Sequence, residues 1–371
     1  MKILITGASG FIGRNLCANF SLRPGTELLT FDLDDPPETL ETSAKACDFA
    51  LHFAGVNRPE SEREFQTVNS GLTQKLVKLL EGREKPAPLV LASSSQASLD
   101  NPYGRSKKAA EEAAFAYGER TGAKVYVYRF PNVFGKWCRP GYNSVVATFC
   151  HNAARARPLR IDAPEKELTL IYVDDLAADL GAAIEGRKRP EADGFCAVRP
   201  VYIVTLGALA EAVTGFAASR GSLTQGYDRA DPFLRKLYST FTSHLPEDGL
   251  AVAADMKHDA RGYFAELIKS PHFGQISVSR TRPGVTRGNH WHNSKAEKFM
   301  VVEGRAVIRF RQYGGGRVIE YPVSGEKIEI IDIPAGYAHA IQNTGRTDVL
   351  TVFWAGEVFD PGDPDVFAQE V

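Results

Sequence analysis

The start of the chain places the tightest constraint on the fold, because the apolar run "KILIT" leads directly into "GASGFIG". The glycines stand at positions 7, 10 and 13, so a tight loop joins a buried strand to the start of a helix. Such a loop lets the main chain approach a pyrophosphate, whose charge the helix N-terminus attracts. In this strand–loop–helix context the pattern predicts a nucleotide-binding unit. The expected contact residues are Gly7, Gly10, Phe11, Ile12 and Gly13.

Apolar runs alternate with helical patterns over about the first 190 residues. "DFALHFAG", "PLVLASSS" and "KVYVYRFPNVFG" are typical of buried parallel strands, and Ala54 at the end of the first run is expected beside the nucleotide. Between them, "FQTVNSGLTQKLVKLLEG" and "YGRSKKAAEEAAFAYGERTG" have helical periodicity and end in glycine. This order predicts right-handed βαβ units and a Rossmann-like, doubly wound parallel sheet. A more irregular stretch, about 187–243, indicates a small substrate lobe.

The character of the chain changes near residue 245. "GQISVSRTRPG", "KIEIIDIPAG" and "VLTVFWAG" are strands separated by Gly/Pro turns, which predicts an all-β barrel or sandwich. We therefore expect an α/β domain over residues 1–245 and an all-β domain over residues 246–371. The length of 371 residues agrees with more than one domain.

Composition excludes several classes of protein. Lys plus Arg (44) nearly balances Asp plus Glu (45), so no net charge favours nucleic acid or an anionic membrane. No apolar run approaches the roughly 20 residues that a membrane helix needs. The five cysteines are scattered and form neither a disulfide framework nor a CxxC pair. We expect a cytoplasmic protein without nucleic-acid partners or membrane insertion.

Asp32 ends the second predicted strand, "ELLTFDLDD", where the adenosine ribose of a dinucleotide is read. Its carboxylate would accept a hydrogen bond from a ribose 2′-hydroxyl and repel a 2′-phosphate. No arginine follows in that loop, so the residues favour NADH over NADPH. The alternative is a solvated turn aspartate without a ligand.

Tyr103 and Lys107 lie one helical turn apart in "NPYGRSKKAAEE" and therefore on one helix face. An ammonium group there lowers the pKa of the phenol, so Tyr103 can exchange a proton with a carbonyl or hydroxyl group. The preceding strand ends in "SSS", whose hydroxyl groups could hold the substrate oxygen. The combination predicts hydride chemistry at a carbonyl.

Together, "TGASGFIG", "DFALHFAG", "SSS", "YGRSK" and "RFPNVFG" resemble the extended short-chain dehydrogenase/reductase family, which acts on nucleotide-activated sugars. The resemblance covers about residues 1–240. It implies that Tyr103 is the proton donor, that Lys107 is its partner in the cofactor site, and that Ser94, rather than Ser95, completes the triad. The link from the serines to Tyr103 is shorter than is usual in the family.

The same resemblance implies further cleft residues. Asn69 matches the asparagine that supports the lysine, and Arg129, Asn132 and Asp174 match positions that line the nucleotide-sugar cleft. The alternative is that they are strand-end and loop polar residues without a ligand. Dehydrating members carry an Asp-Glu pair after the catalytic hydroxyl residue. Ser, Gln and Ala follow here, which favours reduction or epimerisation over dehydration.

A second site is indicated by "GVTRGNHWHNSKAEKFMVVEG" and "PAGYAHAIQN", which match the two cupin motifs. His290 and His292 alternate along a strand and so point to one face. A turn returns Glu297, and the second motif brings His339. Three imidazoles and a carboxylate suit Zn²⁺, and equally Fe²⁺, Mn²⁺ or Ni²⁺.

"DARGYFAE" and "RGNHWH" also resemble the metal-free deoxysugar-nucleotide 3,5-epimerases. In those enzymes the histidine equivalent to His290 is the base that removes a proton next to a ketone. A residue cannot comfortably serve as metal ligand and free base together, so two interpretations of His290 stand.

Over nearly its whole length the chain resembles the CapF/WbjC family of capsular polysaccharide synthesis enzymes, through "DNPYG", "NVFGKWCRPGYNSVVATFC", "LTLIYVDDL" and "GNHWH". The resemblance implies NADPH, Zn²⁺ and a homodimer. It implies a UDP-activated 4-keto-6-deoxy amino sugar, UDP-2-acetamido-2,6-dideoxy-β-L-arabino-4-hexulose, inverted at C3 and reduced at C4 to the L-talose compound. Asp32 departs from the NADPH pattern.

A shared carbonyl explains why the two domains belong together, because the C4 ketone acidifies C3–H and is then reduced. The alternatives are a plain 4-ketosugar reductase with a structural, dimerising zinc cupin, a product sensor or regulatory binding protein, and an iron-dependent cupin dioxygenase.

Overall fold

The structure is a computed structural model and describes residues 1–57, 61, 64–225, 227–228 and 230–371. The chain divides into two compact units, Met1–Val213 with Asp231–Leu245, and Thr214–Ala230 with Pro246–Val371. Sequence reasoning placed 214–230 before the boundary. Here this segment packs in the second unit, where Gln225 N donates to Lys269 O at 2.7 Å.

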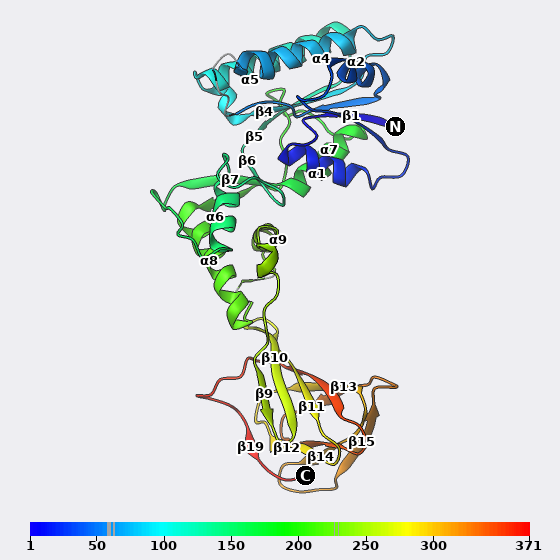
Figure 1. The fold of residues 1–371 in the computed structure, drawn as a ribbon, viewed down its shortest axis with the longest axis vertical. Helices are drawn as coiled ribbons and strands as arrows, with labels where there is room; N and C mark the ends of the chain where they lie inside the picture. The colour runs from blue at the N-terminus through cyan, green and yellow to red at the C-terminus, as the bar shows by residue number, and fades with distance from the viewer. Residues whose placement is uncertain (58–60, 62–63, 226, 229) are drawn as a thin grey trace. The chain divides into compact units, whose positions relative to one another are not determined.

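The N-terminal unit is built on a five-stranded parallel sheet in the order β2-β1-β3-β4-β5 (Figure 1). The strands are nearly continuous in apolar residues because helices cover both faces. Their bounds are β1 (Lys2–Thr6), β2 (Glu27–Phe31), β3 (Phe49–His52), β4 (Leu89–Ser94) and β5 (Val125–Phe130).

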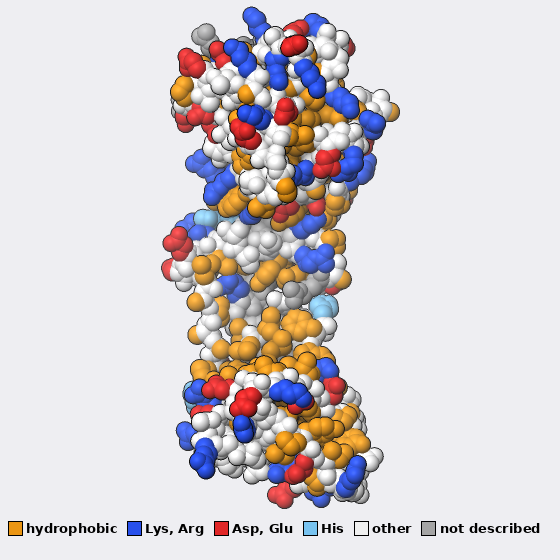
Figure 2. Space-filling view, turned by 90° about the vertical axis from the view of Figure 1, so that its right-hand side faces the viewer, with side chains coloured by type: hydrophobic (Ala, Val, Ile, Leu, Met, Phe, Trp, Pro, Cys, Tyr) orange, Lys and Arg blue, Asp and Glu red, His pale blue; other side chains and the backbone are white. Residues whose placement is uncertain are grey.

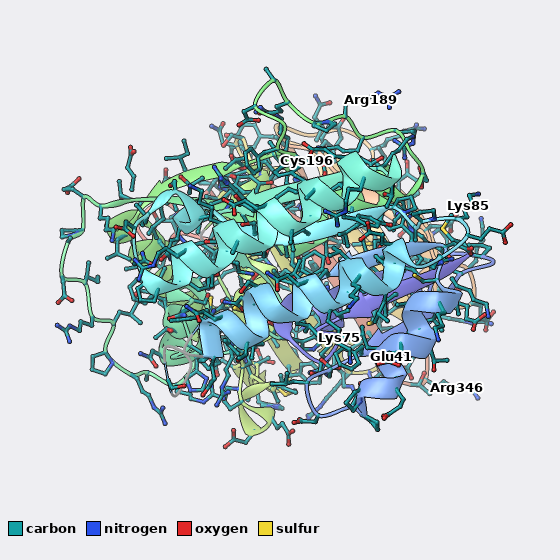
Figure 3. All side chains as sticks on the ribbon, turned by 90° about the horizontal axis from the view of Figure 1, so that it is seen from above. Glu41, Lys75, Lys85, Arg189, Cys196 and Arg346 are labelled. Carbon is teal, nitrogen blue, oxygen red and sulfur yellow. The ribbon has the colours of Figure 1, made fainter. Side chains whose placement is uncertain are left out.

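Two hydrophobic cores lie on the two faces of this sheet. One face packs against α1 and α7, and the other against α2, α4 and α5 (Figure 1). An ion pair of 3.4 Å joins Glu41 of α2 to Lys75 of α4, and Figure 3 labels both side chains. The helices are α1 (Phe11–Phe20), α2 (Pro37–Ala46), the π-helix η1 (Phe65–Gly71), α4 (Leu72–Glu81), the 3₁₀ turn η2 (Ser95–Ser98), α5 (Pro102–Thr121) and α7 (Val173–Ile184).

The predicted strand "KVYVYRFPNVFG" is divided between two sheets. Pro131, which lacks an N–H donor, separates β5 from β6, and β6 pairs with β7 instead. The second sheet has the order β6-β7-β8. Its strands are β6 (Asn132–Phe134), β7 (Glu167–Tyr172) and β8 (Tyr202–Thr205). The helices of this part of the chain are α6 (Val145–Ala153), α8 (Leu206–Ser222) and α9 (Pro232–Thr242), and the 3₁₀ turn η3 (Glu247–Gly249) follows them.

The C-terminal unit contains two antiparallel sheets with the orders β16-β13-β18-β11-β10-β9 and β15-β14-β17-β12-β19. Its core includes Phe299, Ile308 and Ile341; the first two alternate with more exposed residues along their strands, whereas Ile341 ends a run of four buried residues in β17. The strands are β9 (Met256–Asp259), β10 (Gly262–Ser270), β11 (Gly274–Thr281), β12 (Thr286–Trp291), β13 (Glu297–Glu303), β14 (Arg305–Gln312), β15 (Ile319–Ser324), β16 (Ile330–Ile333), β17 (Tyr337–Asn343), β18 (Val349–Ala355) and β19 (Phe367–Ala368).

The architecture confirms the predicted fold class, an α/β unit with a Rossmann-like parallel sheet followed by an all-β unit. On the face shown in Figure 2, basic and acidic side chains are interspersed. Within the described residues, no helix combines the length and apolar character that crossing a membrane requires.

We expect Ile308→Ala to lower the free energy of unfolding of the C-terminal unit by about 2–5 kcal/mol, because the side chain is 0% exposed and leaves a cavity. The matched control is Ile330→Ala, at a side chain 62% exposed, with an effect of at most about 0.5 kcal/mol. Urea titration in a Trp137→Phe background would report this unit alone, since the remaining tryptophans, Trp291 and Trp354, lie in it. Equal losses for both variants would contradict the placement of the core.

Candidate functional site

The glycine loop packs directly on the end of β3. Gly7 has φ +72°, and a Cβ there would lie 2.7 Å from Ala54 N. A Cβ on Gly13 would lie 2.0 Å from Gly7 O. Larger residues would therefore push the loop away from the position that it takes at the start of α1.

A cavity of about 950 Å³ opens beside this loop. All five predicted loop residues line it, and so do Ser94, Tyr103, Lys107 and Asn132. The described part of its wall does not include Asp32, Ala54, Asn69, Arg129 or Asp174. Some of the predicted site residues therefore face the cavity, and the others lie behind or beside it.

Tyr103 and Ser94 stand together on the cavity wall, and Ser94 also caps η2 by accepting from Gln96 N at 3.2 Å. Burial raises the pKa of Tyr103, against the opposing effect of the Ser94 hydroxyl, and so outweighs the lowering expected from Lys107. The phenol is therefore protonated at neutral pH and can donate. Ser95, the alternative residue of the triplet, is exposed and lies outside the described cavity wall.

Lys107 is held on the same helix face as Tyr103. Its Nζ donates to Ala92 O at 3.0 Å, and burial lowers its pKa to about 8, against the opposing charge of Glu111. A Cβ on Gly55 would lie 3.3 Å from Lys107 Nζ and 2.9 Å from the Asn69 amide oxygen. Gly55 thus leaves room for both side chains.

Asn69 is buried and braces the loop after β3. It accepts from Val56 N at 2.8 Å and donates to Val56 O and Ser106 Oγ, both at 3.0 Å. Its place is behind the lysine rather than in the cavity.

Asp32 is hydrogen-bonded to the glycine loop. Its carboxylate accepts from Ser9 N at 3.0 and 3.1 Å and from Ser9 Oγ at 2.8 Å. Asp34 and Asp35 follow within the same turn, and Asp35 accepts from Asp32 N at 2.7 Å. The turn after β2 therefore gathers negative charge at the position expected for a ribose 2′ substituent.

Arg129 and Asp174 are engaged in ion pairs. Arg129 makes a bidentate contact with the buried Glu111 at 2.9 and 2.6 Å, and its guanidinium lies 3.9 Å from the Phe195 ring. Asp174 accepts from Lys136 Nζ at 2.9 Å. These contacts favour the alternative interpretation of both residues, as polar groups that stabilise the cleft without lining it.

The segment 135–144, "GKWCRPGYNS", contributes cavity residues that the sequence prediction missed. Trp137 has φ +68° and lies 4.3 Å from the Arg14 guanidinium, and Arg139 lies 5.5 Å from the Tyr142 ring. The available signal was a group of basic and aromatic residues just after a strand that ends at the cleft.

A second site lies in the C-terminal unit. One ligand atom from each of His290, His292, Glu297 and His339 lies within 4.8 Å of the others. Register brings them together, because His290 of β12 pairs with His339 of β17 and Glu297 begins β13. A bulge between Gly288 and His290 turns β12 at this point.

The donors of this group fit a divalent cation. Among the described residues, His292 Nε2 and His339 Nε2 are buried without a hydrogen-bond partner. They lie 3.3 and 3.6 Å from Glu297 Oε2. Buried polar atoms normally have partners, so atoms converging without one indicate a ligand position. Three imidazoles and a carboxylate would complete a tetrahedral or open site.

The electrostatics favour the neutral, ligating form of two of the three histidines, whereas the pKa of His292 is raised, because the Glu297 carboxylate and the Asp365 carbonyl outweigh its burial. Burial and the neighbouring His290 lower the pKa of His339 to about 4, and burial and His292 lower that of His290. Both imidazoles are neutral at pH 7, as metal ligands must be. A cavity of about 340 Å³ adjoins the group and is lined by His290, His292, Glu297, Glu266 and Lys295 among others.

Comparisons with known proteins match both parts of the chain. Residues 3–193 match the NAD dependent epimerase/dehydratase family, and residues 257–367 match the polysaccharide biosynthesis C-terminal domain. The chain is 43% identical over 371 residues to UDP-2-acetamido-2,6-beta-L-arabino-hexul-4-ose reductase of Pseudomonas aeruginosa, over 100% of this chain and 99% of that protein. The crystal structure of the capsular polysaccharide assembling protein CapF from Staphylococcus aureus superposes with a TM-score of 0.94 at 44% identity, over 100% of both chains.

This chain belongs to the CapF/WbjC family. The predicted resemblance is thereby confirmed over the whole sequence. A further CapF structure, with the inhibitor 3-isopropenyl-tropolone, has a TM-score of 0.89 at 40% identity over 100% of both chains. Both halves of the chain thus have counterparts within single CapF/WbjC proteins.

We expect the purified chain to retain a single divalent ion after dialysis and His339→Gln to lose it, because His339 Nε2 would supply a buried ligand. His258→Gln, at an exposed histidine of β9, is the control and should retain the ion. Inductively coupled plasma mass spectrometry measures the content. Equal metal in both variants would place the ion elsewhere.

Proposed function

We propose that this CapF/WbjC chain is a bifunctional enzyme that inverts C3 and reduces C4 of UDP-2-acetamido-2,6-dideoxy-β-L-arabino-4-hexulose, giving the L-talose compound. The observation that carries the proposal is that Ser94, Tyr103 and Lys107 line one cavity together with the glycine loop. The Pseudomonas relative, a UDP-2-acetamido-2,6-beta-L-arabino-hexul-4-ose reductase, supports the substrate class and the reduction. The place of the reaction in capsular polysaccharide synthesis belongs to the same proposal.

Reduction of C4 would use the N-terminal cavity. Bound reduced nicotinamide dinucleotide supplies the hydride. Ser94 would hold the carbonyl oxygen, and Tyr103, whose raised pKa keeps it protonated, would transfer its proton to that oxygen as the alcohol forms. Lys107 would stabilise the resulting phenolate, since a lysine with a pKa of about 8 is still charged at neutral pH.

The nucleotide part of the substrate would occupy the same cavity toward segment 135–144. Arg139 and Tyr142 of that segment line the wall, as does Asn132. An arginine suits a diphosphate, and an aromatic ring suits a uracil face. The sugar would then lie between this segment and Tyr103.

Inversion at C3 would use the C-terminal unit, which we propose is a cupin. The C4 ketone acidifies the C3 proton, and inversion needs its removal and return on the opposite face. Bound Zn²⁺ supplies positive charge for the developing enolate. Three of the four ligands, His290, His292 and Glu297, border a cavity of about 340 Å³, and a tropolone, whose adjacent oxygens chelate metals, is the inhibitor in a related CapF structure.

The runner-up is a plain 4-ketosugar reductase with a structural, dimerising metal site. The complete burial of His339 favours it, because structural metal sites are closed. The cavity bordered by His290 and Glu297 favours catalysis. A homodimer is proposed for either function.

For the cofactor we propose NADH, in departure from the NADPH that the resemblance implies. Ser9 fixes the Asp32 carboxylate at the edge of the glycine loop, and Asp34 and Asp35 add charge in the same turn. A 2′-phosphate would meet like charge there, whereas a 2′-hydroxyl could donate a hydrogen bond.

To separate the two activities we would use the full chain, because residues 214–230 belong to the C-terminal unit and a fragment starting at 246 lacks them. With the 4-hexulose in D₂O, Tyr103→Phe is expected to keep deuterium incorporation at C3 by NMR. It should lose NADH oxidation by about 10²–10⁴-fold, since the proton donor is missing. His290→Asn is expected to lose the exchange at C3.

The two variants are each other's controls. If metal-loaded wild type oxidises NADH but shows no exchange at C3, the plain reductase is the function. Loss of exchange in Tyr103→Phe would assign C3 chemistry to the N-terminal cavity. Full NADH oxidation by Tyr103→Phe would remove the basis of the whole proposal.

We expect kcat/KM to be at least about tenfold higher with NADH than with NADPH, a difference of about 1.4 kcal/mol. Asp32→Ser should reduce the ratio of kcat/KM with NADH to kcat/KM with NADPH, because it removes the hydrogen-bond acceptor for the ribose and its negative charge. Asp34→Asn removes a charge from the same turn without changing the contact to Ser9, and should have a smaller effect. A preference for NADPH in wild type would show that the carboxylates do not govern the choice.

A further inference from the structure

We propose that Asp365 is a positioning residue of the metal centre, acting through the segment between two of its ligands. The proposal rests on metal binding at His290, His292, Glu297 and His339 as proposed above. Asp365 lies in the C-terminal strap, defined here as residues 357–371, which follows β18 and ends with β19. The sequence motifs for the metal ligands do not reach this segment.

The Asp365 carboxylate binds the turn that joins His292 to Glu297. It accepts from Asn293 N and Lys295 N, both at 2.8 Å, from Ser294 N at 3.0 Å and from Ser294 Oγ at 3.2 Å. Three successive main-chain N–H groups therefore converge on one carboxylate. Because this turn connects two ligands, its conformation sets their separation.

The main chain of Asp365 also orients a ligand directly. His292 Nδ1 lies 2.6 Å from Asp365 O. A carbonyl oxygen can only accept, so Nδ1 carries the proton and Nε2 presents its lone pair to the other ligands. Partners of this kind fix the tautomer and ring orientation of metal-ligating histidines.

Contacts on both sides hold Asp365 in place. On one side, Lys295 Nζ donates to Pro364 O at 2.8 Å. On the other, β19 pairs with β12, and the rings of Trp291 and Phe367 stack with centroids 4.8 Å apart.

The backbone of Asp365 is strained in this arrangement. Asp365 has φ +42°, a left-handed conformation that is unfavourable for a residue with a side chain. Such strain persists where surrounding contacts impose it and is concentrated at functional sites. The strap therefore holds an otherwise disfavoured conformation that lets one residue direct both its carboxylate and its carbonyl to the ligand turn.

The test compares full-length Asp365→Asn with Asp363→Asn, a matched control at an exposed strap aspartate. The isosteric amide turns an NH₂ group toward main-chain donors and lacks the charge. We expect about 10- to 100-fold weaker Zn²⁺ binding in competition with a chromophoric chelator, the range found for outer-shell partners. The control should match wild type.

Melting temperatures with and without Zn²⁺ distinguish positioning from a merely structural role. Positioning predicts that Asp365→Asn lowers the melting temperature more with Zn²⁺ than without it, because weaker binding reduces the Zn²⁺-dependent rise. Equal losses with and without Zn²⁺ would identify only a clamp for the strap. Unchanged affinity would overturn the proposal outright.

Two further variants complete the test. If Asp365→Asn does not fold, Ser294→Ala decides, because it removes one of the four contacts and should still weaken Zn²⁺ binding about threefold, within the range of a single weak hydrogen bond. Wild-type affinity in Ser294→Ala would then count against the proposal. His339→Gln tests the underlying site, since Zn²⁺ affinity that is independent of His339 refutes the metal centre rather than the role of Asp365.

Discussion

The arrangement of the N-terminal cavity depends on keeping one ammonium group, that of Lys107, charged while it is largely withdrawn from water. Ala92 O accepts from it at the end of β4, and Glu111, one helical turn further along α5, supplies the opposing charge. A charge in such a place is tolerated only with partners. Strand end and helix are thereby held in one geometry, which also sets the place of Tyr103.

Glu111, the carboxylate near Lys107, has two further hydrogen-bond partners. Glu111 is 3% exposed and accepts from Ser93 Oγ and from the Arg129 guanidinium. The network joins α5 to β4 and β5, directly beside Ser94. Arg129 therefore contributes to the cleft by neutralising a buried carboxylate. In the C-terminal unit, by contrast, two buried imidazole nitrogen atoms, His292 Nε2 and His339 Nε2, have no hydrogen-bond partner among the described residues and lie near the Glu297 carboxylate.

What could be predicted from sequence had short-range causes. The glycine loop, the Tyr103–Lys107 pair and the His290–His292 alternation each follow from helix or strand geometry over a few residues. Motif spacing added His339, which strand register then brings opposite His290. The fold class followed from the same local patterns.

The remainder depended on contacts between distant segments. The partner of Arg129 is 18 residues away and that of Asp174 is 38 residues away, so neither ion pair has a local signature. Asp365 contacts a turn about 70 residues earlier in the chain, through a strap with little periodicity of its own. The division of the sequence near 245 also overlooked that 214–230 packs with later strands.

That packing has a consequence for how such a protein could arise or be rebuilt. Helix α8 begins in one compact unit and ends in the other, and the chain passes between the units three times, after Val213, Ala230 and Leu245. A single recombination junction cannot exchange either unit intact. Inheritance of the two sites is therefore linked: a donor supplying a new C-terminal unit must also supply the second half of α8 and the residues directly after it, or leave the strand end at Lys269 without its partner Thr224.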